Sequence, residues 1–191
     1  FAIPLCHRYQ VERSRSVANS PVALVPWAAM TDSINKDAFK AVMGSFAAAV
    51  TVVTTRDAEG KRWGMTATAF SSLSLDPPLG LVCIDKRAGC HAAIKAAGTF
   101  AVSMLTEAQE DLSNRFASRS DDKFEGVRSR DGDVTGCPLL DGALAWMECE
   151  LVDVLPGGDY DIFVGRLVSS GTNEGSPLLY WRGSYAGVKP S

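Results

Sequence analysis

Short runs of alternating apolar and polar residues recur along this chain and predict a protein built mainly of β-strands. Residues 79–85 and 99–105 are almost entirely apolar, whereas residues 62–70 alternate between small hydroxyl-bearing and apolar side chains. Alternation with a period of two is typical of a strand with one buried face. The predicted strands cover residues 47–55, 62–70, 79–85, 99–105, 143–155, 160–169 and 178–182.

Three segments instead show the spacing of amphipathic helices. In residues 33–46 the apolar side chains recur at Ile34, Ala38, Phe39, Val42, Met43 and Phe46. Residues 91–97 form a second short helix, and Thr106 opens a third with Gln109 at capping-box spacing. Residues 118–140 are polar and rich in glycine, as expected of a long irregular connection that borders a site. Many short strands with few helices indicate a mainly β fold, a closed β-barrel with flanking helices.

Composition excludes several classes of function. The 191 residues carry a formal net charge of −3, so charge gives no reason to expect binding to nucleic acid or to an anionic membrane. No apolar run approaches the ~20 residues of a membrane helix. The five cysteines form no C-x-x-C pair and there are two histidines, which predicts no metal site, reduced thiols and a cytoplasmic protein.

Residues 1–29 differ from the rest of the chain. They hold three basic residues and one acidic residue, and their apolar positions follow neither a helical nor a strand period. We expect a basic N-terminal extension that is disordered or loosely docked, followed by one domain over residues 30–191, with Met30 as a candidate original start.

Residues 64–78 are the most informative stretch. The first half alternates small hydroxyl and methyl side chains, and the second half is a Ser-rich loop that ends in Asp76-Pro77-Pro78, which must leave the sheet. Such small side chains allow backbone N–H groups to approach a flat polar ligand closely. The alternative is a Thr- and Ser-rich strand that simply faces solvent.

Four segments in order resemble the flavin reductase family, the small FMN-binding split-barrel proteins that partner two-component flavin monooxygenases. The segments are FKAVMGSFAAAVTVVTT at residues 39–55, GMTATAFSSLSLDPPLGLVCIDKRAG at residues 64–89, GDYDIFVGR at residues 158–166 and PLLYWRGSY at residues 177–185. Together they span most of the chain after the N-terminal extension, so the resemblance covers one whole domain.

The resemblance implies an FMN-binding split β-barrel and an NAD(P)H:flavin oxidoreductase. In that interpretation the protein is a homodimer with FMN (or FAD) as cofactor and NADH or NADPH as co-substrate. It passes reduced flavin to a separate oxygenase, typically one that hydroxylates an aromatic or steroid ring. No side chain is expected to be catalytic, because the flavin carries the hydride chemistry.

The resemblance also implies the binding residues. For the flavin they are Thr66, Ala67, Thr68, Ala69, Ser71, Ser72, Leu73, Lys86, Arg87, Asn114 and Phe116. For the nicotinamide dinucleotide they are Asp159, Tyr160, Arg182 and Tyr185. Lys86 and Arg87 are expected to neutralise the flavin phosphate. Tyr160 departs from the family pattern, in which many members have histidine.

Each of these assignments has an alternative. Lys86 and Arg87 also fit a solvated basic turn, Phe116 fits the core of a helix, and Tyr185 fits a barrel rim or subunit interface. At the level of function, the alternative is a non-catalytic flavin carrier or redox sensor on the same barrel. A split-barrel oxidase of the pyridoxamine-phosphate type is less favoured, because the motifs of that family are absent.

Overall fold

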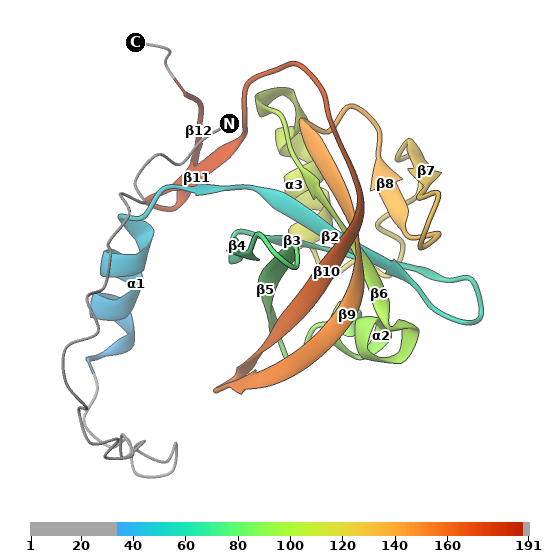
Figure 1. The fold of residues 1–191 in the computed structure, drawn as a ribbon. Helices are drawn as coiled ribbons and strands as arrows, with labels where there is room; N and C mark the ends of the chain where they lie inside the picture. The colour runs from blue at the N-terminus through green and yellow to red at the C-terminus, as the bar shows by residue number, and fades with distance from the viewer. Residues whose placement is uncertain (1–33, 189–191) are drawn as a thin grey trace, which may run out of the picture. The chain divides into compact units, whose positions relative to one another are not determined.

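The computed structural model describes residues 34–188, and the predicted extension at residues 1–29 lies outside them. A seven-stranded antiparallel sheet dominates, in the order β3-β2-β6-β9-β10-β5-β4 (Figure 1). Its strands are β2 (Thr51–Arg56), β3 (Arg62–Ala67), β4 (Phe70–Ser74), β5 (Leu79–Asp85), β6 (Thr99–Met104), β9 (Ala145–Gly157) and β10 (Tyr160–Thr172).

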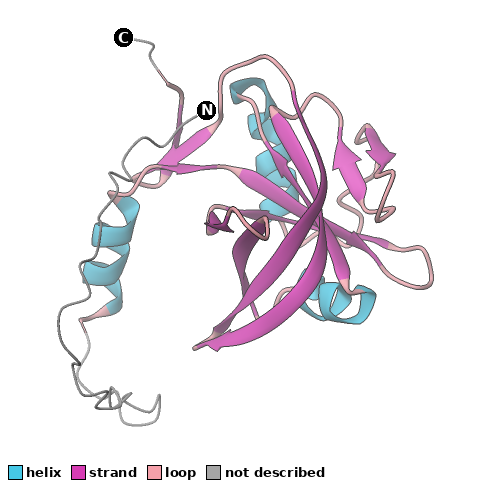
Figure 2. Ribbon diagram, in the orientation of Figure 1, coloured by secondary structure: helices cyan, strands magenta, loops and turns pink. Residues whose placement is uncertain are grey.

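The connection between β3 and β4 explains why this sheet curls. The two strands form opposite edges of the sheet, yet only Thr68 and Ala69 separate them in the chain. A chain advances at most ~3.6 Å per residue, so the two edges meet within about 11 Å at this point. The sheet therefore closes on itself as a barrel, which is the predicted architecture (Figure 2).

The core follows the strand pattern that the sequence predicted. Residues 51–55 of β2, which lies between β3 and β6 in the sheet, are all buried. One apolar cluster includes Ile84 of β5, Phe100 of β6 and Phe163 of β10, together with Ile94 from α2 (Gly89–Ala97). A second cluster joins β2 to Phe116 of α3 (Glu110–Ala117). The two helices thus seal the barrel from outside.

Helix α1 (Lys36–Gly44) stands off from the barrel, as Figure 1 shows. It follows Asn35, whose side chain accepts a hydrogen bond from the Ala38 N–H at 2.8 Å. The predicted amphipathic helix is therefore present, but none of its residues is buried. Next to its C-terminal end lies a small sheet of β1 (Ala48–Ala49), β11 (Leu179–Trp181) and β12 (Ser184–Ala186).

Two segments predicted to be irregular contain strands. The Ser-rich segment is strand β4, which pairs with β5 from Phe70 to Ser74. The prediction of a loop was wrong because it relied on the polar composition. The backbone pairing with β5 does not depend on side chains that face solvent. Within residues 118–140 the chain forms the short pair β7 (Ser129–Asp131) and β8 (Pro138–Leu140). The capping box at Thr106 and Gln109 is confirmed.

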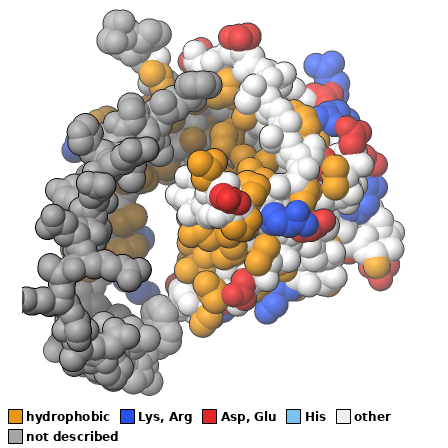
Figure 3. All heavy atoms as spheres, viewed as in Figure 1, with side chains coloured by type: hydrophobic (Ala, Val, Ile, Leu, Met, Phe, Trp, Pro, Cys, Tyr) orange, Lys and Arg blue, Asp and Glu red, His pale blue; other side chains and the backbone are white. Residues whose placement is uncertain are grey.

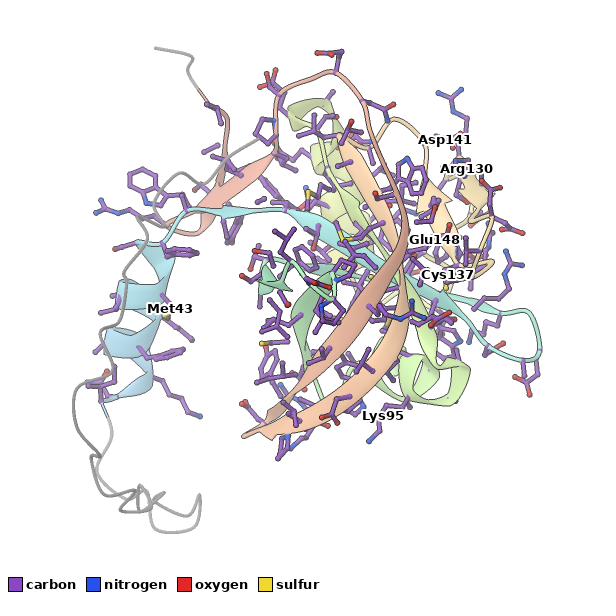
Figure 4. The ribbon with its side chains drawn as sticks, viewed as in Figure 1. Met43, Lys95, Arg130, Cys137, Asp141 and Glu148 are labelled. Atoms are coloured by element: carbon purple, nitrogen blue, oxygen red, sulfur yellow. The ribbon has the colours of Figure 1, made fainter. Side chains whose placement is uncertain are left out.

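A buried carboxylate attaches the irregular connection to the barrel. Glu148 on β9 is 0% exposed and accepts hydrogen bonds from the Thr135 N–H at 2.7 Å, the Thr135 hydroxyl at 2.8 Å and the Val134 N–H at 3.2 Å (Figure 4). Burial raises the pKa of Glu148, but these hydrogen bonds together outweigh burial and hold that pKa below its ordinary value of 4.5.

Replacing Glu148 by alanine should lower the free energy of unfolding by about 2–3 kcal/mol, because the donors of Val134 and Thr135 lose their charged acceptor. Since the native pKa is lowered, the ionised group stabilises the fold fully above pH 4.5, and this contribution is lost as the pH falls through the native value. Urea unfolding at pH 7 and at acid pH measures both effects. Glu148→Gln should weaken the acid dependence, whereas the exposed control Glu125→Gln should not.

Candidate functional site

A recess of about 570 Å³ lies between β3, the turn from β5 into α2, the end of α3 and residues 118–124. Five basic side chains line it, against the two acidic side chains Asp85 and Asp121. The basic residues are Lys61, Arg62, Arg87, Arg119 and Lys123. A recess with this excess of positive charge suits a phosphate-bearing ligand.

An uncharged rim follows the strand β3 that borders this recess. Residues 64–75 contain no charged side chain, and Thr68, Ala69, Ser71, Ser72 and Leu73 are exposed along it. The backbone is fixed there, because the Cys83 N–H of β5 donates to the Ala69 carbonyl at 3.0 Å. We refer to residues 68–73 as the hydroxyl rim. Small side chains on a fixed backbone give a flat ring system close access to the strand edge.

Three of the predicted flavin residues line the recess: Thr66, Arg87 and Phe116. The Thr66 hydroxyl donates to the Ser113 carbonyl of α3 at 2.6 Å. Phe116 is fully buried and packs edge-on to Phe124, with ring centroids 5.0 Å apart. Its side chain is therefore mainly core, the alternative left open by the sequence.

Arg87 lies in the turn after β5 and forms two hydrogen bonds with Asp85, at 3.0 and 2.7 Å. This guanidinium lowers the pKa of Asp85 to about 2. The Arg87 side chain is 85% exposed, so it lies at the mouth of the recess. An incoming phosphate would compete with Asp85 for it.

Ala67 and Asn114, which the resemblance also assigned to the flavin, do not line the recess. The Ala67 side chain is only 7% exposed and belongs to the core, because the alternation along β3 turns it inward. Asn114 is exposed at the surface of α3, and its Oδ1 accepts a hydrogen bond from the Tyr185 hydroxyl at 2.9 Å. The same hydroxyl lies 2.8 Å from the Ser113 Oγ.

The four residues predicted for the nicotinamide dinucleotide fall into two separate pairs. Asp159 and Tyr160 lie at the turn between β9 and β10, whereas Arg182 and Tyr185 lie on the β11–β12 hairpin. Figure 1 shows that turn and that hairpin at opposite ends of the barrel. The fold therefore does not bring the two pairs together within one chain.

Of the two residues predicted to neutralise the phosphate, Arg87 lines the recess and Lys86 does not. The Lys86 ammonium group donates to the Gly158 carbonyl at 2.6 Å and lies 3.3 Å from the Asp161 carboxylate. Gly158 lies in the turn that carries Tyr160, and Asp161 follows Tyr160 on β10.

Lys123 is one of four basic recess residues that the sequence analysis missed, with Lys61, Arg62 and Arg119. Its ammonium group donates to the Phe116 carbonyl at 2.9 Å and to the Gly64 carbonyl at 3.2 Å. Burial lowers the pKa of Lys123. The sequence feature that could have pointed to Lys123 was the polar connection at residues 118–140. This connection was expected to border a site, and its first residues line the recess.

Comparison with a family model settles the relationship of this chain to known proteins. The model of the flavin reductase like domain matches residues 43–189, which include both the hydroxyl rim and the recess. The chain belongs to the flavin reductase-like family. Among curated relatives of this family, the chain is 43% identical over 150 residues to a probable flavin reductase of Rhizobium meliloti (strain 1021). That match covers 78% of this chain but 47% of the Rhizobium protein, so this chain spans about half of that relative.

Another flavin reductase-like relative matches over most of both lengths. The reductase subunit HsaB of a flavin-dependent monooxygenase from Rhodococcus jostii (strain RHA1) is 40% identical over 164 residues, covering 85% of this chain and 83% of that protein. Among solved structures, the NADH:FAD oxidoreductase SgcE6 of Streptomyces globisporus C-1027, in complex with NAD and FAD fragments, superimposes with a TM-score of 0.78. It is 36% identical, over 82% of this chain and 94% of that one. The predicted split-barrel fold is thereby confirmed.

The described residues also bear on metals and membranes. Within residues 34–188, no group of three His, Cys, Asp or Glu side chains is placed to hold a metal ion. In the same range, no helix has the length and apolar character needed to cross a membrane.

Proposed function

We propose that this protein is an NAD(P)H-dependent flavin reductase that supplies reduced FMN or FAD to a separate oxygenase. The observation that carries the proposal is the uncharged hydroxyl rim beside a recess with five basic side chains. A flavin has the matching halves, a flat polar ring system and an anionic phosphate arm. The names of the relatives agree, since they include a monooxygenase reductase subunit and an NADH:FAD oxidoreductase.

In this proposal the side chains bind and orient, and the bound flavin supplies the hydride chemistry. The rim residues Thr68, Ala69, Ser71, Ser72 and Leu73 border the ring, and Thr66 stands where the rim meets the recess. Arg87 and Lys123 are placed to attract the phosphate arm. Tyr160 offers an exposed aromatic surface to the nicotinamide, which must stack within about 3–3.5 Å of the flavin for hydride transfer.

The test of this function is oxidation of NADH or NADPH with added FMN or FAD, measured as the loss of nicotinamide absorbance. A reductase turns over many equivalents of flavin. If the protein binds flavin tightly but leaves both NADH and NADPH unoxidised under anaerobic and aerobic conditions, it is a flavin carrier or redox sensor. Failure to bind any flavin would refute both functions. Adding a flavin-dependent oxygenase and its substrate then tests the transfer of reduced flavin.

The location that we propose is the cytoplasm, where NADH is available. In the described part of the chain Cys83, Cys90, Cys137 and Cys149 are all free thiols. Free thiols are typical of reducing compartments. Fractionation of the source cells and mass spectrometry of trapped thiols test this location.

We also propose that the protein is a homodimer, with α1 in the interface. Large apolar side chains of the α1 region are 51–71% exposed: Ile34, Phe39, Val42, Met43 and Phe46. A second apolar surface lies on the barrel flank around β4, β5 and the β9–β10 hairpin (Figure 3), where Leu73, Leu75, Val152 and Leu155 are exposed. Exposed apolar surface of this extent is typical of an interaction site, and a second copy would cover both areas.

The change Phe39→Glu should convert the dimer to a monomer, because it places a charge in an apolar interface. Light scattering at micromolar concentration should show the mass halved, with the secondary structure unchanged. Lys40→Gln, on another face of α1, changes the net charge equally and should remain dimeric. A monomeric wild-type protein, or a dimeric Phe39→Glu variant, would show that α1 does not form a dimer interface.

A further inference from the structure

The turn between β9 and β10 is held in place by contacts from outside its own hairpin. It contains Gly157, Gly158 with φ +80°, Asp159 and the first residue of β10, Tyr160. Two consecutive glycines leave a turn conformationally free, so a defined position for Tyr160 needs further restraint. The turn also extends to the last rung of the sheet, where Tyr160 is paired with Asp85 of β5.

Lys86 supplies that restraint with both its backbone and its side chain. The Lys86 N–H donates to the Asp159 carbonyl at 3.1 Å and continues the β5–β10 ladder by one rung. Its ammonium group donates to the Gly158 carbonyl at 2.6 Å. A single residue therefore binds two successive carbonyls of the turn. The contact to Gly158 is charge-assisted, which makes it stronger than a neutral hydrogen bond.

Asp161 and His91 fix Lys86 from the other side. The Asp161 Oδ1 lies 3.3 Å from the Lys86 ammonium, and the Asp161 Oδ2 lies 2.8 Å from the His91 Nε2 on α2. The side chains of Asp161 and His91 are each only 12% exposed. His91 in turn packs edge-on to the core ring of Phe163, with centroids 5.0 Å apart. The turn is thus connected through Lys86 and Asp161 to the rigid core.

We propose that Lys86, held by Asp161 and His91, is a positioning residue that fixes the β9–β10 turn and so presents Tyr160 to the nicotinamide dinucleotide. This role rests on the proposed reductase function and differs from a role in phosphate binding. It explains why Lys86 binds two carbonyls of the turn, those of Gly158 and Asp159, whereas its neighbours Asp85 and Arg87 line the recess.

The kinetic test uses Lys86→Met, which keeps the length of the side chain and removes its donors. The KM for NADH should rise roughly three- to tenfold, while kcat at saturating NADH and the Kd for flavin hardly change. Lys86→Arg, which keeps the charge and a donor, should restore much of the loss. Lys95→Met, at an exposed lysine on α2 (Figure 4), removes the same charge and should behave as wild type.

A double-mutant cycle tests whether Lys86 acts through Tyr160. If it does, Lys86→Met adds little to the KM of Tyr160→Ala, because the surface that Lys86 positions is already absent. Full additivity of the two changes would overturn the proposal. So would a Lys86→Met variant with unchanged KM that binds FMN more weakly and riboflavin normally, because that result places the lysine at the phosphate.

Hydrogen exchange separates this proposal from the reductase function. In the unliganded protein, Lys86→Met should speed exchange of the amides at residues 157–160 several-fold, and Lys95→Met should not. This readout requires neither flavin nor NADH. If the wild type fails to oxidise NADH and NADPH but the turn loosens in Lys86→Met, the restraint is real and the reductase function is wrong. Unchanged exchange in Lys86→Met would refute the restraint itself.

Discussion

Replacing Ala69 by leucine should abolish flavin binding at concentrations that saturate the wild-type protein. Ala69 is one of the two residues that join β3 to β4, and its side chain is exposed on the hydroxyl rim. The Cys83 N–H fixes its carbonyl, so the backbone cannot move aside for a larger side chain. An isobutyl group would occupy the space that a flat ring needs. We expect the Kd to rise by at least ~100-fold, which corresponds to about 2.7 kcal/mol.

Fluorescence titration of FMN measures this effect directly. Since position 69 faces solvent, the thermal midpoint of Ala69→Leu should stay near that of the wild type, which separates loss of the site from loss of the fold. Ala96→Leu, at an exposed alanine of α2, is the matched control and should bind flavin normally. Normal FMN affinity in the Ala69→Leu variant would place the ring away from the hydroxyl rim.

The parts of the fold that sequence predicted best are those in which side chains determine the structure. Strands β5 and β6 have apolar side chains on buried positions, and α1 has the spacing of an amphipathic helix. Strand β4 was not predicted, because its Ser-rich sequence matches a loop and only pairing with β5 makes it a strand. That pairing depends on closure of the barrel, which a local pattern does not contain.

The candidate site, like the fold, was predicted from the sequence only in part. The motif at residues 64–75 predicted the hydroxyl rim, because close approach to a strand edge depends on small residues in one continuous segment. The partners of Lys86 could not be predicted, since Gly158 and Asp161 lie more than 70 residues further along the chain. The resemblance placed Arg182 and Tyr160 in one site, and within one chain their elements lie at opposite ends of the barrel.

Tyr160→Ala should raise the KM for NADH by about tenfold or more. Tyr160 is 40% exposed at the β9–β10 turn, where an aromatic surface is available for stacking. Stacking of a base on an aromatic side chain is worth roughly 1–3 kcal/mol in nucleic-acid complexes. We expect the same scale for the nicotinamide, and 1.4 kcal/mol corresponds to one decade in affinity. The Kd for flavin should hardly change, because the rim and the recess remain intact.

Steady-state kinetics of Tyr160→Ala and Tyr160→His at saturating flavin decide between two roles for this position. If the position provides an aromatic surface, Tyr160→His stays close to wild type, since the imidazole ring also stacks. Hydride transfer needs no proton from this side chain, so neither variant should change the dependence of kcat on pH. If Tyr160→Ala left KM and kcat unchanged, the β9–β10 turn would be a plain hairpin with no role in binding the nicotinamide. The nicotinamide would then have to bind elsewhere, and the β11–β12 hairpin with Arg182 and Tyr185 would be the next surface to test.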